Sequence, residues 1–280
     1  MNFRQAIALA LSLTALSLTP ACKRQPSVSE GKKSSDLQGR GFSLKQGLEI
    51  AIAQERQVEE GQLAAGKGPW IRKLRIENPS GAEGLSFTWK MGGPSTESQP
   101  SAADSGKMIL ANTVGSRRMT LPLFWPGGEL FMSNSSGVWL SDQAFSELKK
   151  EGKTQYDLGL VDNPLLGPAQ GLPILEHGLA AYNQGLATRP ERKTQDLQWE
   201  VSDDSRDYAL KVNGVLVEVE ALEAVSPLAK IVVLDNPQNP LVLEVEVAPP
   251  SSAARALFLP LSWMRGLLSY KVESLDLPSS

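Results

Sequence analysis

The sequence predicts a mainly β protein: a β-rich α+β body, arranged as an antiparallel sandwich or a barrel-like sheet with a few short helices. Strand signals outnumber helix signals along the 280-residue chain. Two pairs of apolar segments are joined by turn residues, as in β-hairpins. Only one segment carries a full set of helix-end signals. Antiparallel hairpins with few helices favour a sandwich or a barrel-like sheet.

Alternation of apolar and polar residues locates the strands. Asn213-Gly214 joins two of them and tolerates positive φ at both turn positions, which predicts a type I′ hairpin. The segment 235–240 contains two prolines and two asparagines, and predicts a second hairpin with a longer, stiff loop. In the predicted strand over residues 70–77, Ile71 is one step out of phase with the alternation of apolar and polar residues. The predicted strands cover residues 70–77, 85–89, 119–123 (loosely), 208–212, 215–221, 230–234, 241–247 and 266–277.

One short helix is predicted after Leu140, which can pack on Phe145 as a hydrophobic staple. Phe145 and Leu148 then share the face toward the core. The end signals are Ser141 as N-cap, Asp142 in the first turn, Lys149 and Lys150 in the last turn, and Gly152 beyond it. Residues 44–62 fit a helix, although Ile50 and Ile52 also fit a strand, and residues 172–186 fit a third short helix.

The N-terminus has the pattern of a secretory signal. Arg4 precedes an apolar run over residues 6–18, which has the length of a signal-peptide core and is shorter than the ~20 residues that span a bilayer. The run ends in Leu18-Thr19-Pro20-Ala21-Cys22, and Cys22 is the only cysteine of the chain. An ordinary signal peptide cleaved after Ala21 would leave this thiol free at the mature N-terminus.

This ending resembles the lipobox of bacterial lipoproteins, in which small residues precede the cysteine. Ala21 and Cys22 fit that pattern, whereas Thr19 and Pro20 differ from its aliphatic-then-small start. The resemblance implies a diacylglyceryl group and further acyl chains such as palmitate on Cys22. A thiolate is nucleophilic enough to accept them, and more than one chain gives stable anchoring. Lys23, in place of Asp, implies sorting to the outer membrane.

The chain therefore divides into a signal peptide (residues 1–21), a flexible tether (22–41) and a β-rich globular body (42–278). The tether is rich in Ser, Gly, Lys and Gln, and is too polar to fold by itself. The polar segment 187–196 is a candidate boundary between two halves of the body. Asp-Asn-Pro occurs at 162–164 and at 235–237, which fits either an internal repeat or coincident turn chemistry.

Composition excludes several classes of function. A net charge of −3 is too balanced for a nucleic-acid binder held mainly by phosphates. One histidine and one cysteine exclude a His-rich metal site and an intrachain disulfide. The chain also has no phosphate-binding loop and no dinucleotide fingerprint. We therefore predict no metal ion, no cofactor and no nucleic-acid partner.

No segment has the residues of a catalytic site in a convincing context. His177 is the sole histidine and is read as structural, because nothing local marks it as a base. Asp104-Ser105-Gly106 matches a protease signature but follows no apolar strand. The serine-rich segment 133–137 predicts a turn. Asp203, Asp204 and Asp207 predict a solvated turn before the hairpin rather than a calcium site. We predict no catalytic residue.

Tryptophans are the remaining candidates for binding. Most of the six lie in apolar or alternating segments typical of a core. Trp125 precedes Pro126-Gly127-Gly128, a turn that could present it to a glycan or peptide. We take Trp125, together with the sole histidine, His177, as the candidate binding residues.

The sequence predicts a lipid-anchored bacterial envelope protein that acts as a non-catalytic interaction or binding module, with the membrane and an envelope protein as partners. One alternative is an envelope hydrolase that acts on peptide or glycan through an unrecognised carboxylate pair. Another is an assembly factor in which residues 241–247 form an exposed edge strand that pairs with a partner strand.

Overall fold

The computed structural model describes residues 42–54, 69–81, 84–92, 105–122, 125, 127–159, 198–247 and 269–278. Several predictions lie outside these ranges. They are the signal peptide and tether, the helix over 172–186 with His177, the boundary at 187–196, Asp104 and the Asp-Asn-Pro turn at 162–164.

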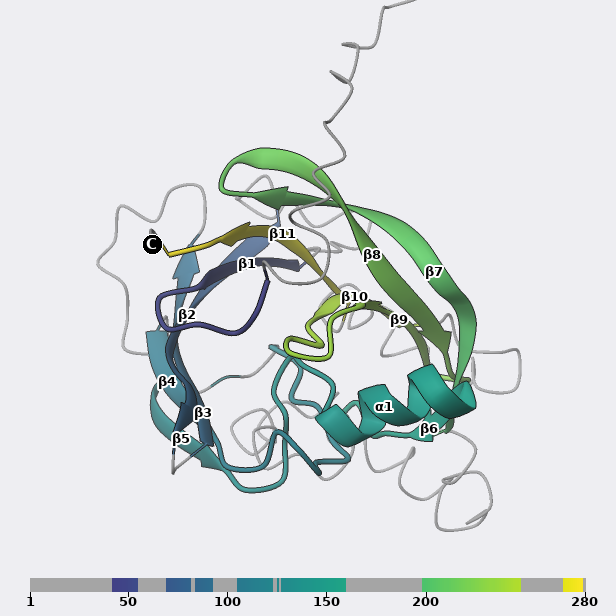
Figure 1. Ribbon diagram of the computed structural model, residues 1–280. Helices are drawn as coiled ribbons and strands as arrows, with labels where there is room; N and C mark the ends of the chain where they lie inside the picture. Colours follow the sequence, from purple (N-terminus) through teal and green to yellow (C-terminus); the bar gives the residue numbers. More distant parts are fainter. Residues whose placement is uncertain are drawn as a thin grey trace, which may run out of the picture. The chain divides into compact units, whose positions relative to one another are not determined.

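The described residues form eleven strands and one helix, which confirms the mainly β class (Figure 1). The strands are β1 (Glu49–Gln54), β2 (Trp70–Gly81), β3 (Gly84–Gly92), β4 (Ser105–Leu110), β5 (Gly128–Met132), β6 (Lys153–Gln155), β7 (Gln198–Val212), β8 (Val215–Val225), β9 (Ala229–Leu234), β10 (Val242–Val247) and β11 (Tyr270–Asp276); the helix is α1 (Asp142–Glu151).

All eleven strands belong to one mixed sheet, in the order β5-β4-β3-β2-β1-β11-β10-β9-β8-β7-β6. β11 is its junction. One edge of β11 pairs with β1 along its length, whereas the other edge pairs first with β10 and then, in parallel, with β7. The last pairing closes a circuit of five strands, β7 to β11 (Figure 1). The prediction of a barrel-like arrangement therefore fits this half of the sheet.

The Asn213-Gly214 turn closes that circuit. Its two residues have φ values of 47° and 80°, as the predicted type I′ hairpin requires. The backbone N–H of Asn213 donates to the Leu275 carbonyl at 2.9 Å, and its side-chain oxygen accepts from the Leu277 N–H at 2.7 Å. A local turn preference thus also fixes a long-range contact with β11.

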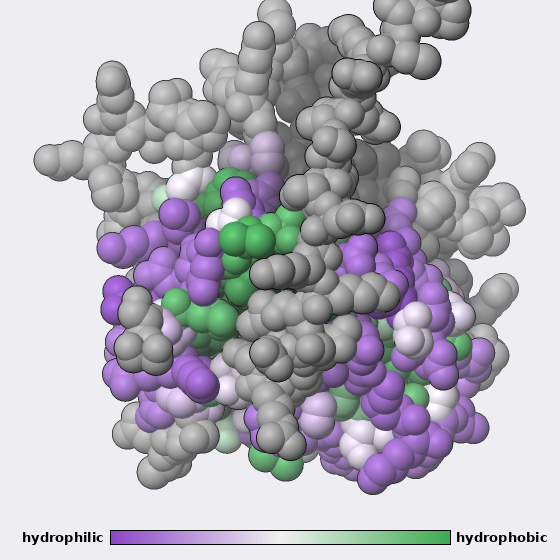
Figure 2. Space-filling view, turned by 45° about the horizontal axis from the view of Figure 1, so that its top comes forward, coloured by the Kyte–Doolittle hydropathy of each residue, from purple (hydrophilic) through white to green (hydrophobic). Residues whose placement is uncertain are grey.

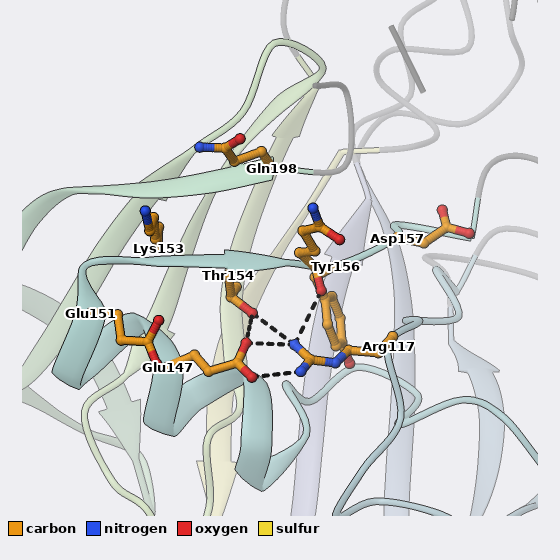
Figure 3. Close-up of a pocket in the computed structure, with 9 residues that line it drawn as sticks. Arg117, Glu147, Glu151, Lys153, Thr154, Tyr156, Asp157 and Gln198 are labelled. Carbon is orange, nitrogen blue, oxygen red and sulfur yellow. Dashed lines mark hydrogen bonds and ion pairs between the residues drawn. The ribbon is translucent and has the colours of Figure 1, made fainter. Parts of the chain in front are cut away.

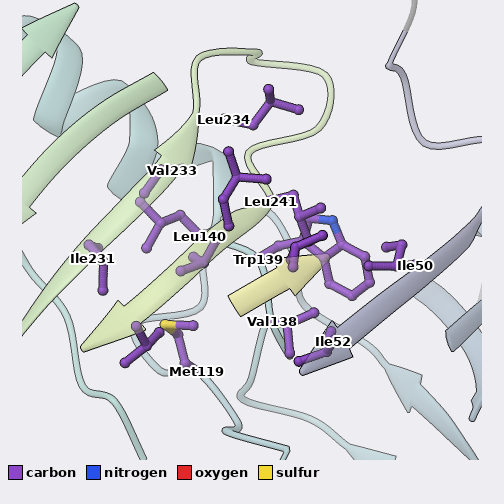
Figure 4. Close-up of a cluster of buried hydrophobic side chains, with 14 of the residues drawn as sticks. Ile50, Ile52, Met119, Val138, Trp139, Leu140, Ile231, Val233, Leu234 and Leu241 are labelled. Atoms are coloured by element: carbon purple, nitrogen blue, oxygen red, sulfur yellow. The ribbon is translucent and has the colours of Figure 1, made fainter. Parts of the chain in front are cut away.

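One continuous core fills the inner side of the sheet. Trp139, 2% exposed, lies amid aliphatic side chains of β1 and β9 (Figure 4). Its backbone bridges to Leu241, and its indole N–H donates to the Asn239 side chain at 2.8 Å. Asn239 in turn donates to the Phe42 carbonyl at 2.6 Å. The asparagine-rich turn between β9 and β10 therefore holds the centre of the core.

Helix α1 confirms the predicted end signals. The Ser141 side chain accepts a hydrogen bond from the Ala144 N–H, and Gly152 ends the helix in the left-handed conformation. Ala144, Phe145 and Leu148 are buried on the predicted face. Within the described residues, no helix has the length and apolar character needed to span a membrane.

Two predictions about strands are wrong. Residues 119–122 form no strand, because this segment crosses the core between two others: Met119 N–H donates to Asp157 and Thr120 N–H to Gly137, and Met119, Thr120 and Leu121 are all buried rather than alternating. β10 is not an exposed edge, because it lies between β9 and β11. Among the described strands, the sheet ends at β5 and β6 instead.

The aspartate cluster also differs from its prediction. Asp203, Asp204 and Asp207 are exposed but lie within β7, where the register against β8 shifts twice, rather than in a turn. A bulge accommodates the same Asp- and Ser-rich composition as a turn. The structure also assigns residues 49–54 to a strand, which resolves part of the open choice over 44–62.

Candidate functional site

A polar cavity of about 520 Å³ lies between α1, β6 and the start of β7 (Figure 3). Its volume falls within the range of small-ligand pockets. Arg117 reaches it from the segment between β4 and β5. Its lining residues are Arg117, Glu147, Glu151, Lys153, Thr154, Gln155, Tyr156, Asp157 and Gln198.

An arginine–carboxylate pair forms one wall of the cavity. The two terminal nitrogens of Arg117 donate to the two carboxylate oxygens of Glu147, each at 2.5 Å. The Thr154 hydroxyl donates to Glu147 at 2.6 Å, and Gln143 adds a fourth bond at 3.2 Å. A bidentate pair of this kind fixes both side chains in one plane. The helix face and the β6 strand are thereby held together.

The electrostatics of this pair decide what chemistry it can do. Hydrogen bonding to Arg117 lowers the pKa of Glu147 to about 2, and the same bond raises the pKa of Arg117. Asp157, a second carboxylate of the cavity, pairs with Arg118 at 2.9 Å. A general acid needs a carboxyl group that holds its proton near neutral pH. Glu147 cannot meet this requirement.

Tyr156 forms the floor of the cavity and is 2% exposed. Its hydroxyl bonds to Ser136, and burial raises its pKa, so that the phenol stays neutral. The predicted turn over 133–137 is confirmed: Ser135 and Ser136 are buried hydrogen-bonding partners of Thr120 and Tyr156. These serines hold the floor of the cavity in place.

The rim of the cavity offers both donors and acceptors. Glu151, Lys153 and Gln155 are exposed, and Gln198 is half-buried at the beginning of β7. A wall of paired charges and a rim of mixed polarity suit a polar ligand with its own donors and acceptors, such as a peptide backbone or a sugar.

The structure places the sequence-predicted candidates elsewhere. Trp125 is 4% exposed and packs in the core, near Phe87 and Trp89, rather than at the cavity. His177 lies outside the described residues. Within the part of the chain that the structure describes, no three His, Cys, Asp or Glu side chains gather as a metal site would require.

Sequence reasoning missed the pair that forms the cavity wall. Arg117 and Glu147 are far apart in the chain, in a loop and in a helix, and no local pattern connects them. The hydrophilic side of α1 gives a partial signal, because Gln143 and Glu147 are spaced to interact on one helical face.

On the face shown in Figure 2, hydrophilic residues predominate; apolar residues form a larger group left of the centre and smaller spots elsewhere. The large apolar side chains that are exposed, among those the structure describes, are Trp70, Val114, Phe131, Val215, Leu216 and Val225.

No protein-family model, curated protein or solved structure matches the chain.

Proposed function

We propose that this protein is a non-catalytic binding module of the bacterial envelope, anchored to the outer membrane through lipidated Cys22. The cavity beside α1 takes a polar segment, peptide or glycan, of an envelope partner. The observation that carries the choice of binding over hydrolysis is the state of Glu147. Its carboxylate already accepts four hydrogen bonds, from Arg117, Thr154 and Gln143, which leaves it neither a proton to donate nor a free lone pair for a base.

The anchor rests on the lipobox-like ending at Cys22. It is tested with the full chain and a Cys22→Ser variant, expressed in a bacterial host and fractionated. The parent is expected in the membrane fraction, with a mass increased by acyl chains, and the variant in the soluble fraction. Equal processing and equal solubility of both proteins would overturn the anchor.

Binding at the cavity is tested by photo-crosslinking in living cells. A photoreactive residue is introduced at Lys153, which is exposed at the cavity rim, and at Lys211, which is exposed on β7 and does not line the cavity. Glycan or peptide of the envelope is expected to crosslink at position 153 only. Equal crosslinking at both positions, or none at 153, would contradict a binding role for this cavity.

The hydrolase alternative makes a different prediction. If Glu147 took part in bond cleavage, the purified protein would release fragments from envelope peptide or glycan, and Glu147→Gln would abolish that release. We expect no release from either protein. Turnover that depends on Glu147 would replace the binding module with the hydrolase.

A further inference from the structure

Arg72 occupies a core position of β2. It alternates with Leu74 and Ile76 on the inner face, and it is 4% exposed. Its cross-strand neighbours are Ile52 on β1 and Met91 on β3. A guanidinium almost never occupies such a place without a paired carboxylate, because a buried charge is costly to desolvate.

Two indole rings form the corner that holds this cation. The guanidinium carbon of Arg72 lies 4.9 Å from the ring centroids of both Trp89 and Trp125, and these two rings meet edge to face at 5.9 Å. Cation–π attraction partly offsets the cost of burying the charge. It acts on the faces of the rings and supplies no acceptor for the Nε and Nη1 groups of Arg72.

Three hydrogen-bond donors in this corner have no partners among the described residues. Nε and Nη1 of Arg72 and the indole nitrogen of Trp125 are buried and bond to nothing there. Two other buried indoles, those of Trp139 and Trp199, donate to the Asn239 side chain and to the Tyr156 carbonyl, each at 2.8 Å. Of these three indoles, only that of Trp125 lacks an acceptor. Elsewhere among the described residues, the Tyr208 hydroxyl and the Asn236 side-chain nitrogen are also buried without a partner.

All three unsatisfied groups are donors, which requires an acceptor rather than a cation. A planar oxyanion accepts from a guanidinium through a pair of N–H groups, either Nε with Nη2 or Nη1 with Nη2, so that each pair includes one of the two unpartnered nitrogens. The corner contains one positive charge between aromatic walls. A single negative charge neutralises it, whereas a phosphate dianion would leave a net charge in apolar surroundings.

The face that carries Arg72 is accessible at one end. Trp70, two residues before Arg72 on the same side of β2, is 36% exposed, so this end of the face reaches the surface. The cross-strand row that contains Trp89 continues as Gly106 and Gly128, which carry no side chains.

The geometry points to a carboxylate-binding site in which Arg72 and the Trp125 indole N–H hold the carboxylate of a small, partly apolar molecule. The ring of such a ligand would pack beside the two indoles. This site is separate from the polar cavity and does not depend on the membrane anchor, so that either proposal can fail without the other.

The test uses the purified full chain and benzoate as probe, with benzamide and inorganic phosphate as comparisons, followed by calorimetry and by tryptophan fluorescence. Benzoate is expected to bind at millimolar concentration or below, and the neutral benzamide is not. Arg72→Met is expected to weaken benzoate binding at least about tenfold. Arg75→Met is the matched control, because Arg75 is an exposed arginine on the same strand.

Trp125→Phe provides a second variant in case Arg72→Met fails to fold, because it keeps an aromatic ring and removes only the indole donor. It is expected to weaken benzoate binding severalfold. Three results would overturn the site: no benzoate binding by the parent protein, equal binding by Arg72→Met, or binding of phosphate in preference to benzoate.

Discussion

Replacing Arg72 with methionine removes a buried charge and keeps a flexible side chain that can fill the same space. Arg72 is 4% exposed and has no carboxylate partner among the described residues. We expect the ligand-free Arg72→Met variant to be more stable than the parent protein, which is the reverse of the usual effect of a substitution in a core.

The expected magnitude follows from burial and ring contacts. Burial lowers the pKa of Arg72 from its ordinary value of 12.5 to about 9. The difference corresponds to a cost of about 5 kcal/mol, at about 1.4 kcal/mol per pKa unit. Contacts with Trp89 and Trp125 return about 1–2 kcal/mol each. Arg72→Met should therefore stabilise the fold by about 1–3 kcal/mol, which raises the Tm by about 2–4 °C for each kcal/mol.

The gain should depend on pH in a defined direction. Below pH 9, Arg72 is charged in both the folded and the unfolded chain, and the whole cost is present. Above pH 9, the folded chain releases the proton while the unfolded chain keeps it, so the parent gains stability relative to the variant. Buried tyrosines 156, 208 and 270, whose pKa values burial raises, destabilise both proteins equally in this range.

Thermal unfolding followed by circular dichroism at pH 7 and at pH 10 measures both effects. Arg75→Met again serves as the control, since it alters an exposed arginine on the same strand. A variant Arg72→Met that melts several degrees below the parent at pH 7 would refute the reasoning, because Arg72 would then be a stabilising, fully compensated residue.

Three further predictions concern stability. Trp139→Phe leaves the buried side-chain oxygen of Asn239 unpaired, whereas Trp125→Phe breaks no hydrogen bond. In urea unfolding, Trp139→Phe should therefore lose about 1–3 kcal/mol more stability than Trp125→Phe, and equal losses would contradict this prediction. Gly84→Ala would place a Cβ 2.0 Å from a backbone oxygen, so it should lower the Tm far more than Gly128→Ala, where φ is also positive but space is open. Glu147→Gln should lower the free energy of unfolding by about 1 kcal/mol or less at pH 7, because solvent screens the pair. Near pH 2 it should change nothing, because stabilisation by this carboxylate is present above about pH 4.5 and is lost as the pH falls toward 2. Unchanged melting at pH 7 would count against the pair.

Features set by neighbouring residues could be predicted from the sequence. Ser141 and Gly152 delimit α1, and Asn213-Gly214 forms its hairpin, because caps and turns depend on backbone preferences within a few residues. The fold of residues 119–122 and the place of β10 could not be predicted, since both depend on partners distant in sequence. The pairing of β11 with β7, which closes the five-strand circuit, could not be predicted for the same reason.

The site around Arg72 did leave a trace in the sequence. In the segment Trp70-Ile71-Arg72, the isoleucine is one step out of phase with the strand, and the arginine occupies the position that alternation reserves for the core. A single charged residue at such a position is ordinarily attributed to imperfect alternation in the strand. The structure shows that Arg72 keeps its inward position and has Trp89 and Trp125 around it. Local pattern and global fold agree almost everywhere else in β2, and such a conflict is more typical of functional positions than of random ones. The presence of Arg72 at an inward-facing position of β2 is therefore itself an argument that this end of the sheet binds an anion.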